Sequence, residues 1–215
     1  MLDLRDGFAW VRLHGDGYVG YMDATALGDV TGQTTDEVIA PSTMIYPKPD
    51  IKSSPAIIIP MLSRLMVVGQ EKEFLVLASG GYVYARHVRP LAPAASGDHV
   101  AVAQRFLFTP YFWGGKTVHG IDCSGLVQVA LQAVGQAVLR DSDMQEQSLG
   151  KALSVEDARH LQRGDFVFWD GHVGMMVDAT TLLHANGFHM MVTEEPLAEA
   201  MARIAKPVSA YKRLQ

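Results

Sequence analysis

The stretch that decides the fold is GIDCSGL, residues 120–126. Apolar residues follow at steps of three and four, namely Leu126, Val129, Ala130, Ala133 and Val134. This spacing puts them on one face of a helix, and a glycine, here Gly135, is typical of the residue that ends one. We therefore predict a helix over residues 121–134, with Cys123 at or near its start.

Cys123 is the only cysteine in the 215 residues. Unpaired N–H groups and the positive end of the helix dipole favour a thiolate at a helix start. A lone cysteine is more often a small buried hydrophobic residue. Here the polar neighbours Asp122 and Ser124, and flanking glycines that permit close backbone approach, favour a nucleophile.

Two of the eight histidines follow in strand-like runs, His172 in GHVGMMVD and His184 in TLLHANG. A thiolate nucleophile needs a base and a group that orients the base. His172 is the candidate base, because the glycines beside it leave room for a substrate. His184 is the candidate orienting group. Asn186, on the same strand face as His184, is the alternative.

The region around these residues changes from helical to strand-like patterns. Helical spacing covers residues 100–108 and 121–134, with residues 155–161 as a third candidate helix. Strand-like runs follow at residues 165–169, 172–177, 182–185 and 190–192. A helical half followed by a strand-rich half predicts an α+β fold.

The region before residue 92 contains a repeated hairpin pattern. Residues 8–27, FAWVRLHGDGYVGYMDATAL, resemble residues 74–91, FLVLASGGYVYARHVRPL. Further strand-like runs precede the second copy, so that about five short strands predict a small barrel. No such strand-like runs precede the first copy, so it predicts only part of a barrel. The alternative is that the two hairpins resemble each other by chance.

We therefore divide the chain into three parts. Residues 1–30 are assigned to the hairpin of a partial first barrel, residues 38–92 to a complete small barrel, and residues 98–215 to the catalytic domain. The small and polar stretch APAASGD, residues 92–98, reads as the linker before that domain.

Composition argues against several classes of function. A net charge of −5 without a basic stripe does not suit nucleic-acid binding, and the apolar runs are much shorter than the roughly 20 residues of a membrane span. No signal peptide is visible and one cysteine fits a reducing compartment, so we expect a cytoplasmic protein. Cys123 with His172, His184 and His189 lacks zinc-site spacing, so we expect no metal and no other cofactor.

Four blocks occur in order: YFWGGKTVHGIDCSGLV, RDSDMQEQ, RGDFVFWDGHVGMMVD and LLHANG. Together they resemble the NlpC-type cell-wall cysteine peptidases, over about residues 100–214. The preceding region is similar to bacterial SH3-like barrels. More narrowly, the chain resembles members that cleave between D-glutamate and a diamino acid in murein recycling. The resemblance implies a papain-like catalytic domain and a murein peptide as the binding partner.

The resemblance also implies a role for each candidate residue. Cys123 would attack the γ-D-glutamyl amide carbonyl and form a thioester, His172 would take and return the proton, and His184 would orient His172. Asp122 and Ser124 would bind the free amino terminus of an L-alanine in the substrate. Asp122 could instead be an ordinary acidic residue at a helix start.

Tyr111 resembles an aromatic residue near the oxyanion site, and Trp113 would shape the cleft beside it. Both could instead be core aromatic residues. Residues 140–142, Arg-Asp-Ser, could line the diamino-acid side or form a solvated loop.

In this family a barrel often closes one end of the cleft, and the candidates for such a wall are Tyr18, Tyr21 and Tyr84. Two other functions stay open: an amidase or acyltransferase with the same Cys-His pair, and a non-catalytic wall-binding protein.

Overall fold

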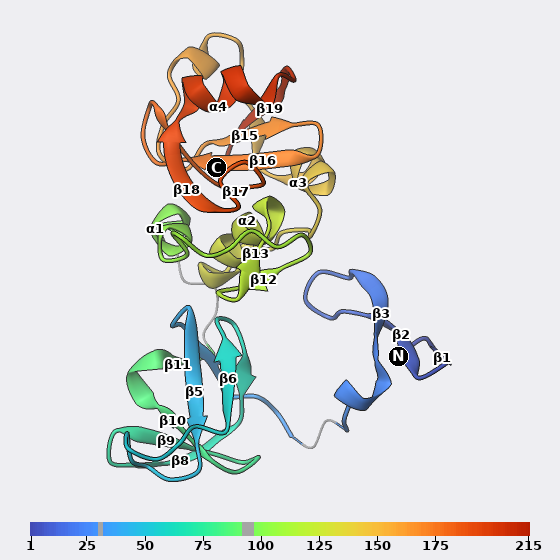
Figure 1. Cartoon of the computed structure of the whole chain (residues 1–215), viewed down its shortest axis with the longest axis vertical. Helices are drawn as coiled ribbons and strands as arrows, with labels where there is room; N and C mark the ends of the chain where they lie inside the picture. The colour runs from blue at the N-terminus through green and yellow to red at the C-terminus, as the bar shows by residue number, and fades with distance from the viewer. Residues whose placement is uncertain (30–31, 92–96) are drawn as a thin grey trace.

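The computed structural model describes residues 1–29, 32–91 and 97–215. Three units follow one another along the chain: a small sheet, a barrel and a larger unit with helices and an antiparallel sheet (Figure 1). In the last unit, three of the four α-helices precede the main run of antiparallel strands, which confirms the α+β fold class.

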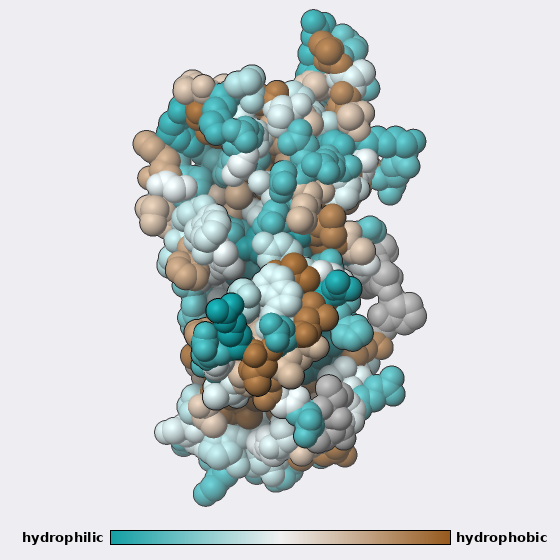
Figure 2. All heavy atoms as spheres, turned by 90° about the vertical axis from the view of Figure 1, so that its right-hand side faces the viewer, coloured by the Kyte–Doolittle hydropathy of each residue, from teal (hydrophilic) through white to brown (hydrophobic). Residues whose placement is uncertain are grey.

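The first unit is a three-stranded antiparallel sheet of β1 (Asp3–Arg5), β2 (Phe8–Arg12) and β3 (Val19–Asp23). Asp6 and Gly7 join β1 to β2 with φ values of 50° and 81°, as a tight hairpin turn requires. Only Ala9 and Val11 are buried in β2, while large apolar side chains such as Phe8 are exposed. Figure 2 looks from the side on which this sheet lies and shows brown, hydrophobic atoms there among teal and white ones.

The second unit contains the eight strands β4 to β11 in two antiparallel sheets, ordered β6-β5-β10-β9-β8 and β11-β4-β7. Leu77, Val83 and Val88 form its small core. The strands are β4 (Asp36–Val38), β5 (Ser42–Tyr46), β6 (Ile57–Pro60), β7 (Arg64–Leu65), β8 (Val67–Glu71), β9 (Phe74–Leu77), β10 (Tyr82–Tyr84) and β11 (Val88–Pro90).

The repeated hairpin is confirmed. β2 pairs with β3 and β9 pairs with β10, both antiparallel. Each pair is followed by one 3-10 turn, η1 (Ala24–Ala26) and η2 (Ala85–His87). Similar alternation and a similar glycine turn therefore produce the same local structure twice.

The third unit packs helix α2 (Cys123–Ala133) against a six-stranded sheet of order β14-β19-β15-β16-β17-β18. Its main core joins the apolar face of α2 to the sheet through Leu126, Ala130, Val173 and Leu183. The other elements are α1 (His99–Gln104), β12 (Lys116–Thr117), β13 (Gly120–Ile121), α3 (Ser142–Ser148), β14 (Lys151–Ala152), η3 (Asp157–Arg159), β15 (Phe166–Trp169), β16 (His172–Met176), β17 (Thr181–Asn186), β18 (Met191–Pro196), α4 (Leu197–Ile204) and β19 (Val208–Arg213).

Several helix predictions need correction. The predicted helix over residues 155–161 is only the 3-10 turn η3, since Val155 is 80% exposed and there is no continuous apolar face to bury. The helix predicted over residues 100–108 stops at Gln104. Helices α3 and α4 were not predicted, and only the first residue of α3, Ser142, falls within the stretch 140–142 that was read as a loop. Residues 92–96 of the predicted linker lie outside the described residues, and Asp98 at its end caps α1.

Hydrogen bonds hold the three units together. From the first unit, Tyr18 Oη donates to Asp141 Oδ2 at 3.0 Å, and Asp16 Oδ2 accepts from Gln128 Nε2 at 2.9 Å. From the barrel, Arg89 Nη2 donates to the carbonyl of Ala133 at 2.8 Å. The two contacts from the first unit bring the β2–β3 loop to the middle of α2 and to the residue before α3.

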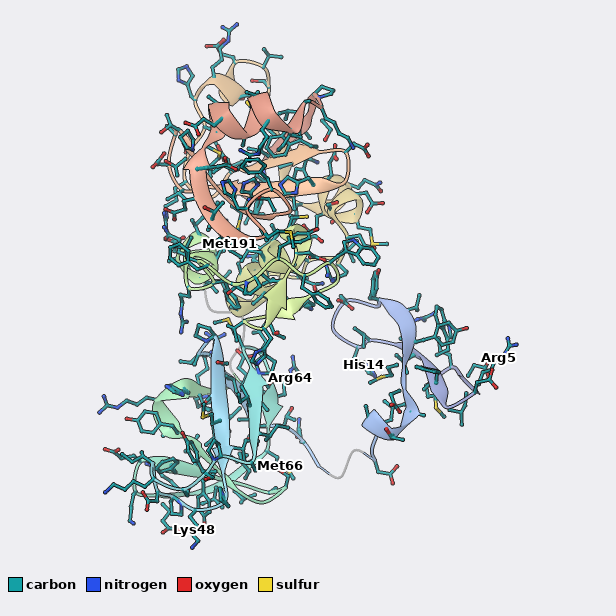
Figure 3. The ribbon with its side chains drawn as sticks, in the orientation of Figure 1. Arg5, His14, Lys48, Arg64, Met66 and Met191 are labelled. Carbon is teal, nitrogen blue, oxygen red and sulfur yellow. The ribbon has the colours of Figure 1, made fainter. Side chains whose placement is uncertain are left out.

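A hollow of about 890 Å³ lies where the three units meet. It is lined by His14 from the first unit, Arg64 from the barrel and Gln132 from α2, the first two of which are labelled in Figure 3. Among the helices of the described residues, none has the length and apolar character to cross a membrane.

Candidate active site

Cys123 is the first residue of α2, as the sequence predicted to within two positions. Asp122 is the N-cap: its Oδ1 accepts from the backbone N–H of Gly125 at 2.6 Å, and its Oδ2 accepts from the backbone N–H of Gly114 at 2.7 Å. A Cβ at residue 125 would collide with the carbonyl of Gly115, so this turn requires glycine. The cap therefore fixes the thiol at the helix start.

His172 and His184 lie on the neighbouring strands β16 and β17, and their rings are joined by a 2.8 Å hydrogen bond between His172 Nε2 and His184 Nδ1. Asn186 does not occupy this place. Its Oδ1 accepts from the backbone N–H of His189 at 2.8 Å. Of the two orienting groups considered, His184 is the one that contacts His172.

The chain of hydrogen bonds continues past His184 to a carboxylate. His184 Nε2 lies 2.6 Å from Glu195 Oε1, and both guanidinium nitrogens Nη1 and Nη2 of Arg203 donate to the same carboxylate, Nη1 to Oε2 at 2.7 Å. Burial alone would raise the pKa of Glu195, but the hydrogen bonds from Arg203 and His184 lower it below its ordinary value. Glu195 is therefore an ionised acceptor.

This series of hydrogen bonds assigns the tautomers of the His172 and His184 rings. Because Glu195 can only accept, His184 Nε2 carries the hydrogen and His184 Nδ1 has a lone pair. His172 Nε2 must then donate to that lone pair. The remaining ring nitrogen, His172 Nδ1, is left with the lone pair that a base needs.

The sequence analysis did not identify Glu195 or Arg203. Glu195 faces Leu182 across β17 and β18, so it is a diagonal neighbour of His184 on the same face. Predicting the register of this hairpin would have found it. Arg203 comes from the unpredicted helix α4, and no spacing signal points to it.

Burial is the largest influence on the pKa values of Cys123 and His172. Burial, with the charges of His184 and Arg203, lowers the pKa of His172 to about 3. Burial also raises the pKa of Cys123, and a hydrogen bond from the backbone of Val173 offsets this only in part. The helix start predicted a lowered thiol pKa, and here burial outweighs it. Both shifts favour a neutral thiol and a neutral imidazole over an ion pair.

A cavity of about 500 Å³ opens beside Cys123. It brings together the thiol and all four predicted substrate residues, and the first unit adds Tyr18. The lining residues are Tyr18, Tyr111, Trp113, Gly114, Asp122, Cys123, Ser124, Arg140, Asp141, Ser142 and Gly171. Trp113 is 83% exposed at the rim, so its reading as a core aromatic residue is wrong, whereas Tyr111 is half-buried.

Arg140 is not part of a solvated loop. It is 8% exposed, and its guanidinium donates to Asp122 Oδ2 at 2.7 Å and to Ser124 Oγ at 2.8 Å. A buried carboxylate needs a partner of opposite charge, and Arg140 supplies it. Asp122 is therefore both the helix cap and half of a buried ion pair.

The described ranges hold no group of three or more His, Cys, Asp or Glu side chains arranged to bind a metal ion. The site offers a thiol that is hydrogen-bonded to the backbone of Val173, the residue after His172, and an imidazole whose ring is held by His184.

Residues 108–205 match the sequence model of the NlpC/P60 family, and residues 1–27 match that of the bacterial dipeptidyl-peptidase SH3 domain. A gamma-D-glutamyl-L-lysine dipeptidyl-peptidase of Bacillus cereus is 26% identical over 217 residues, covering 86% of this chain and 63% of that protein. Dipeptidyl-peptidase 6 of Lysinibacillus sphaericus is 34% identical over 119 residues, covering 51% of this chain and 43% of that one.

The fold is shared with a solved structure of an NlpC/P60 family protein from Bacillus cereus. The TM-score is 0.79 at 22% identity, and the match covers 98% of this chain and 77% of that one. The chain spans less than two thirds of the length of either curated relative named above.

Proposed function

Since this chain carries an NlpC/P60 family domain, we propose that it is a cysteine peptidase that hydrolyses the γ-D-glutamyl-diamino acid amide bond of peptidoglycan peptides. One observation carries the proposal: the line of hydrogen bonds from His172 through His184 to Glu195, with Cys123 at the adjoining helix start. The substrate follows from the relatives, two of which are named gamma-D-glutamyl-L-lysine dipeptidyl-peptidases.

His172 acts as a general base in this mechanism. It takes the thiol proton as Cys123 Sγ attacks the amide carbonyl, because both pKa shifts favour a neutral resting pair. The imidazolium then gives the proton to the leaving amine, and a thioester remains on Cys123. Water hydrolyses the thioester with His172 again as base. Tyr111, which lines the same cavity as Cys123, would stabilise the developing oxyanion.

The cavity beside Cys123 would hold the acyl half, L-alanyl-γ-D-glutamate. Tyr18 from the first unit forms one wall, hydrogen-bonded to Asp141. The Asp122 charge is paired with Arg140, which leaves Asp141 as the better partner for a free ammonium group. Asp122 and Ser124 contribute to the shape and polarity of the same wall. This arrangement favours short peptides with a free amino end.

The test compares L-Ala-γ-D-Glu-diamino acid with its N-acetylated copy, using mass spectrometry of the products. We expect release of the free dipeptide L-Ala-D-Glu from the first peptide, little cleavage of the second, and none with Cys123→Ala. Equal cleavage of both peptides would contradict the free-amine requirement. A product in which the acyl group is joined to another amine would identify an acyltransferase.

A further inference from the structure

Gln128 lies in the middle of α2, the helix that begins at Cys123, and its side chain is completely buried. Its Nε2 donates to Asp16 Oδ2 at 2.9 Å and to the carbonyl of Val138 at 3.3 Å. Both of these oxygens accept, which fixes the amide with its nitrogen toward them. The side chain thereby joins the catalytic helix to the first unit and to the segment that leads to α3.

The oxygen end of the same amide fits this core poorly. Among the residues that the structure describes, Gln128 Oε1 has no hydrogen-bond partner. Burying an acceptor without a partner is unfavourable, and an apolar side chain of similar volume would avoid this cost. The nitrogen end, in contrast, has an acceptor for each of its two hydrogens. What the amide contributes is therefore the pair of contacts that Nε2 makes.

Asp16 carries the contact from α2 to the wall of the catalytic cavity. While its Oδ2 accepts from Gln128, its Oδ1 accepts from the backbone N–H of Tyr18 at 3.0 Å. The Tyr18 hydroxyl then donates to Asp141, which lies in the same segment as Val138. These contacts form a closed ring that starts and ends at the Gln128 amide.

The wall formed by Tyr18 and Asp141 has no packed core behind it. A further cavity of about 420 Å³ shares Tyr18, Arg140 and Asp141 with the cavity beside the thiol, so these residues lie between the two. Empty space provides no atoms that would hold a side chain by packing. The position of the Tyr18 ring therefore depends on hydrogen bonds at both ends of the residue, and the backbone end is anchored through Asp16.

We propose that Gln128 is a positioning residue for substrate selection, which acts through Asp16 to hold Tyr18 in the wall of the catalytic cavity. This inference rests on the proposed function, in which the free amino end of the peptide binds at Asp141. With the wall in place, an ammonium group meets the carboxylate and a blocked amino end lacks room. Without the Gln128 contact, Tyr18 is free to move toward the further cavity, so the ammonium contact weakens and space for an N-acyl group opens.

The test uses Gln128→Met, which keeps the side-chain volume and removes both contacts of Nε2. Steady-state kinetics is measured on L-Ala-γ-D-Glu-diamino acid and on its N-acetylated copy. For the free-amine peptide we expect KM to rise with kcat nearly unchanged, and the ratio of the two kcat/KM values to fall about five- to tenfold. Gln132 lies one turn further along α2 and lines the hollow between the three units, so Gln132→Met is the matched control and should leave the ratio unchanged. A lower kcat for both peptides at an unchanged ratio would mean a defect of the helix and would overturn the proposal.

Asp16→Ala tests the route from Gln128 to Tyr18. If Gln128 acts through Asp16, the double variant has the same ratio as Asp16→Ala alone, whereas two independent falls that multiply would overturn this route.

Hydrogen exchange measured by mass spectrometry gives a readout that does not depend on activity. We expect Gln128→Met to speed exchange in the β2–β3 loop, at residues 13–18, and to leave exchange in α2 unchanged. Unchanged exchange in this loop overturns the positioning role while the peptidase stands. If the wild type cleaves neither peptide, the proposed function fails, and the selection that rests on it fails too, even where the loop exchanges faster.

Discussion

His184 Nε2 lies 2.6 Å from Glu195 Oε1, and both side chains are buried. Replacing Glu195 by Leu removes the acceptor that fixes the His184 tautomer. His184 Nδ1 is then no longer fixed as an acceptor for His172 Nε2, and the lone pair of His172 is no longer fixed on Nδ1. We expect kcat to fall roughly ten- to hundredfold, as when a functional histidine loses its hydrogen-bond partner, with KM little changed. Steady-state kinetics on the tripeptide measures this.

Glu195→Gln is the matched control for that change. It retains an oxygen that can accept from His184 Nε2 but removes the negative charge opposite Arg203. A substantial recovery of kcat relative to Glu195→Leu indicates that Glu195 acts by positioning. If Gln and Leu are equally inactive, the charge itself is required and the tautomer argument is insufficient.

The buried pair of Asp122 and Arg140 makes a prediction about stability. Their side chains are 7% and 9% exposed, and the Arg140 guanidinium contacts both carboxylate oxygens. Arg140→Met leaves a buried carboxylate without its partner, which costs about 3–5 kcal/mol in the free energy of unfolding. Urea denaturation followed by circular dichroism measures it. Adding Asp122→Asn to this variant should restore part of the loss; a loss that persists unchanged would argue for packing rather than charge.

The sequence alone was sufficient to propose those candidate residues whose positions follow from a local sequence pattern. Cys123 could be placed because the apolar periodicity that defines α2 lies in the same segment, and the glycines around it need a tight turn. His172 and His184 could be proposed because each opens or interrupts an apolar strand run. Local pattern is sufficient for such positions.

What the sequence did not reveal depends on pairing between distant segments. Glu195, which was missed, reaches His184 through the register of β17 and β18. Arg140 was considered as a cavity-lining residue, but its ion pair with Asp122, formed from the segment between α2 and α3, was not predicted. Helix α3 lacks a broad apolar stripe, with only Gln145 buried, and is fixed by bonds from Gln145 Nε2 to the carbonyls of Ser124 and Leu139. Tertiary contacts of this kind do not produce a periodic pattern in the amino-acid sequence.

A variant at Tyr18 tests what the first unit contributes to binding of the tripeptide. Its hydroxyl donates to Asp141 at 3.0 Å on the wall of the cavity beside Cys123. Tyr18→Phe removes one hydrogen bond, so we expect KM for the free-amine tripeptide to rise about three- to tenfold with kcat nearly unchanged. Asp16→Asn is the control for docking of the hairpin, because it weakens the contact to Gln128 and keeps an amide oxygen that can accept from the backbone N–H of Tyr18. Equal effects of the two variants would assign the change to docking and not to the hydroxyl.

The histidine pair predicts how stability responds to acid. Burial lowers the pKa of His172 from its ordinary value of 6.5 to about 3, so between these values the unfolded chain binds a proton that the folded chain does not. Stability is therefore fully present above about pH 6.5 and falls as the pH decreases toward 3, by up to about 1.4 kcal/mol per pH unit for this residue. His184, whose pKa burial also lowers, adds to the same dependence of stability on pH.

Urea midpoints measured from pH 7.5 to 4 should show a shallower decline for His172→Gln than for the wild type, because the variant lacks one of the protons taken up on unfolding. Parallel curves for the two proteins would mean that His172 is already charged in the folded state at neutral pH, paired with a Cys123 thiolate.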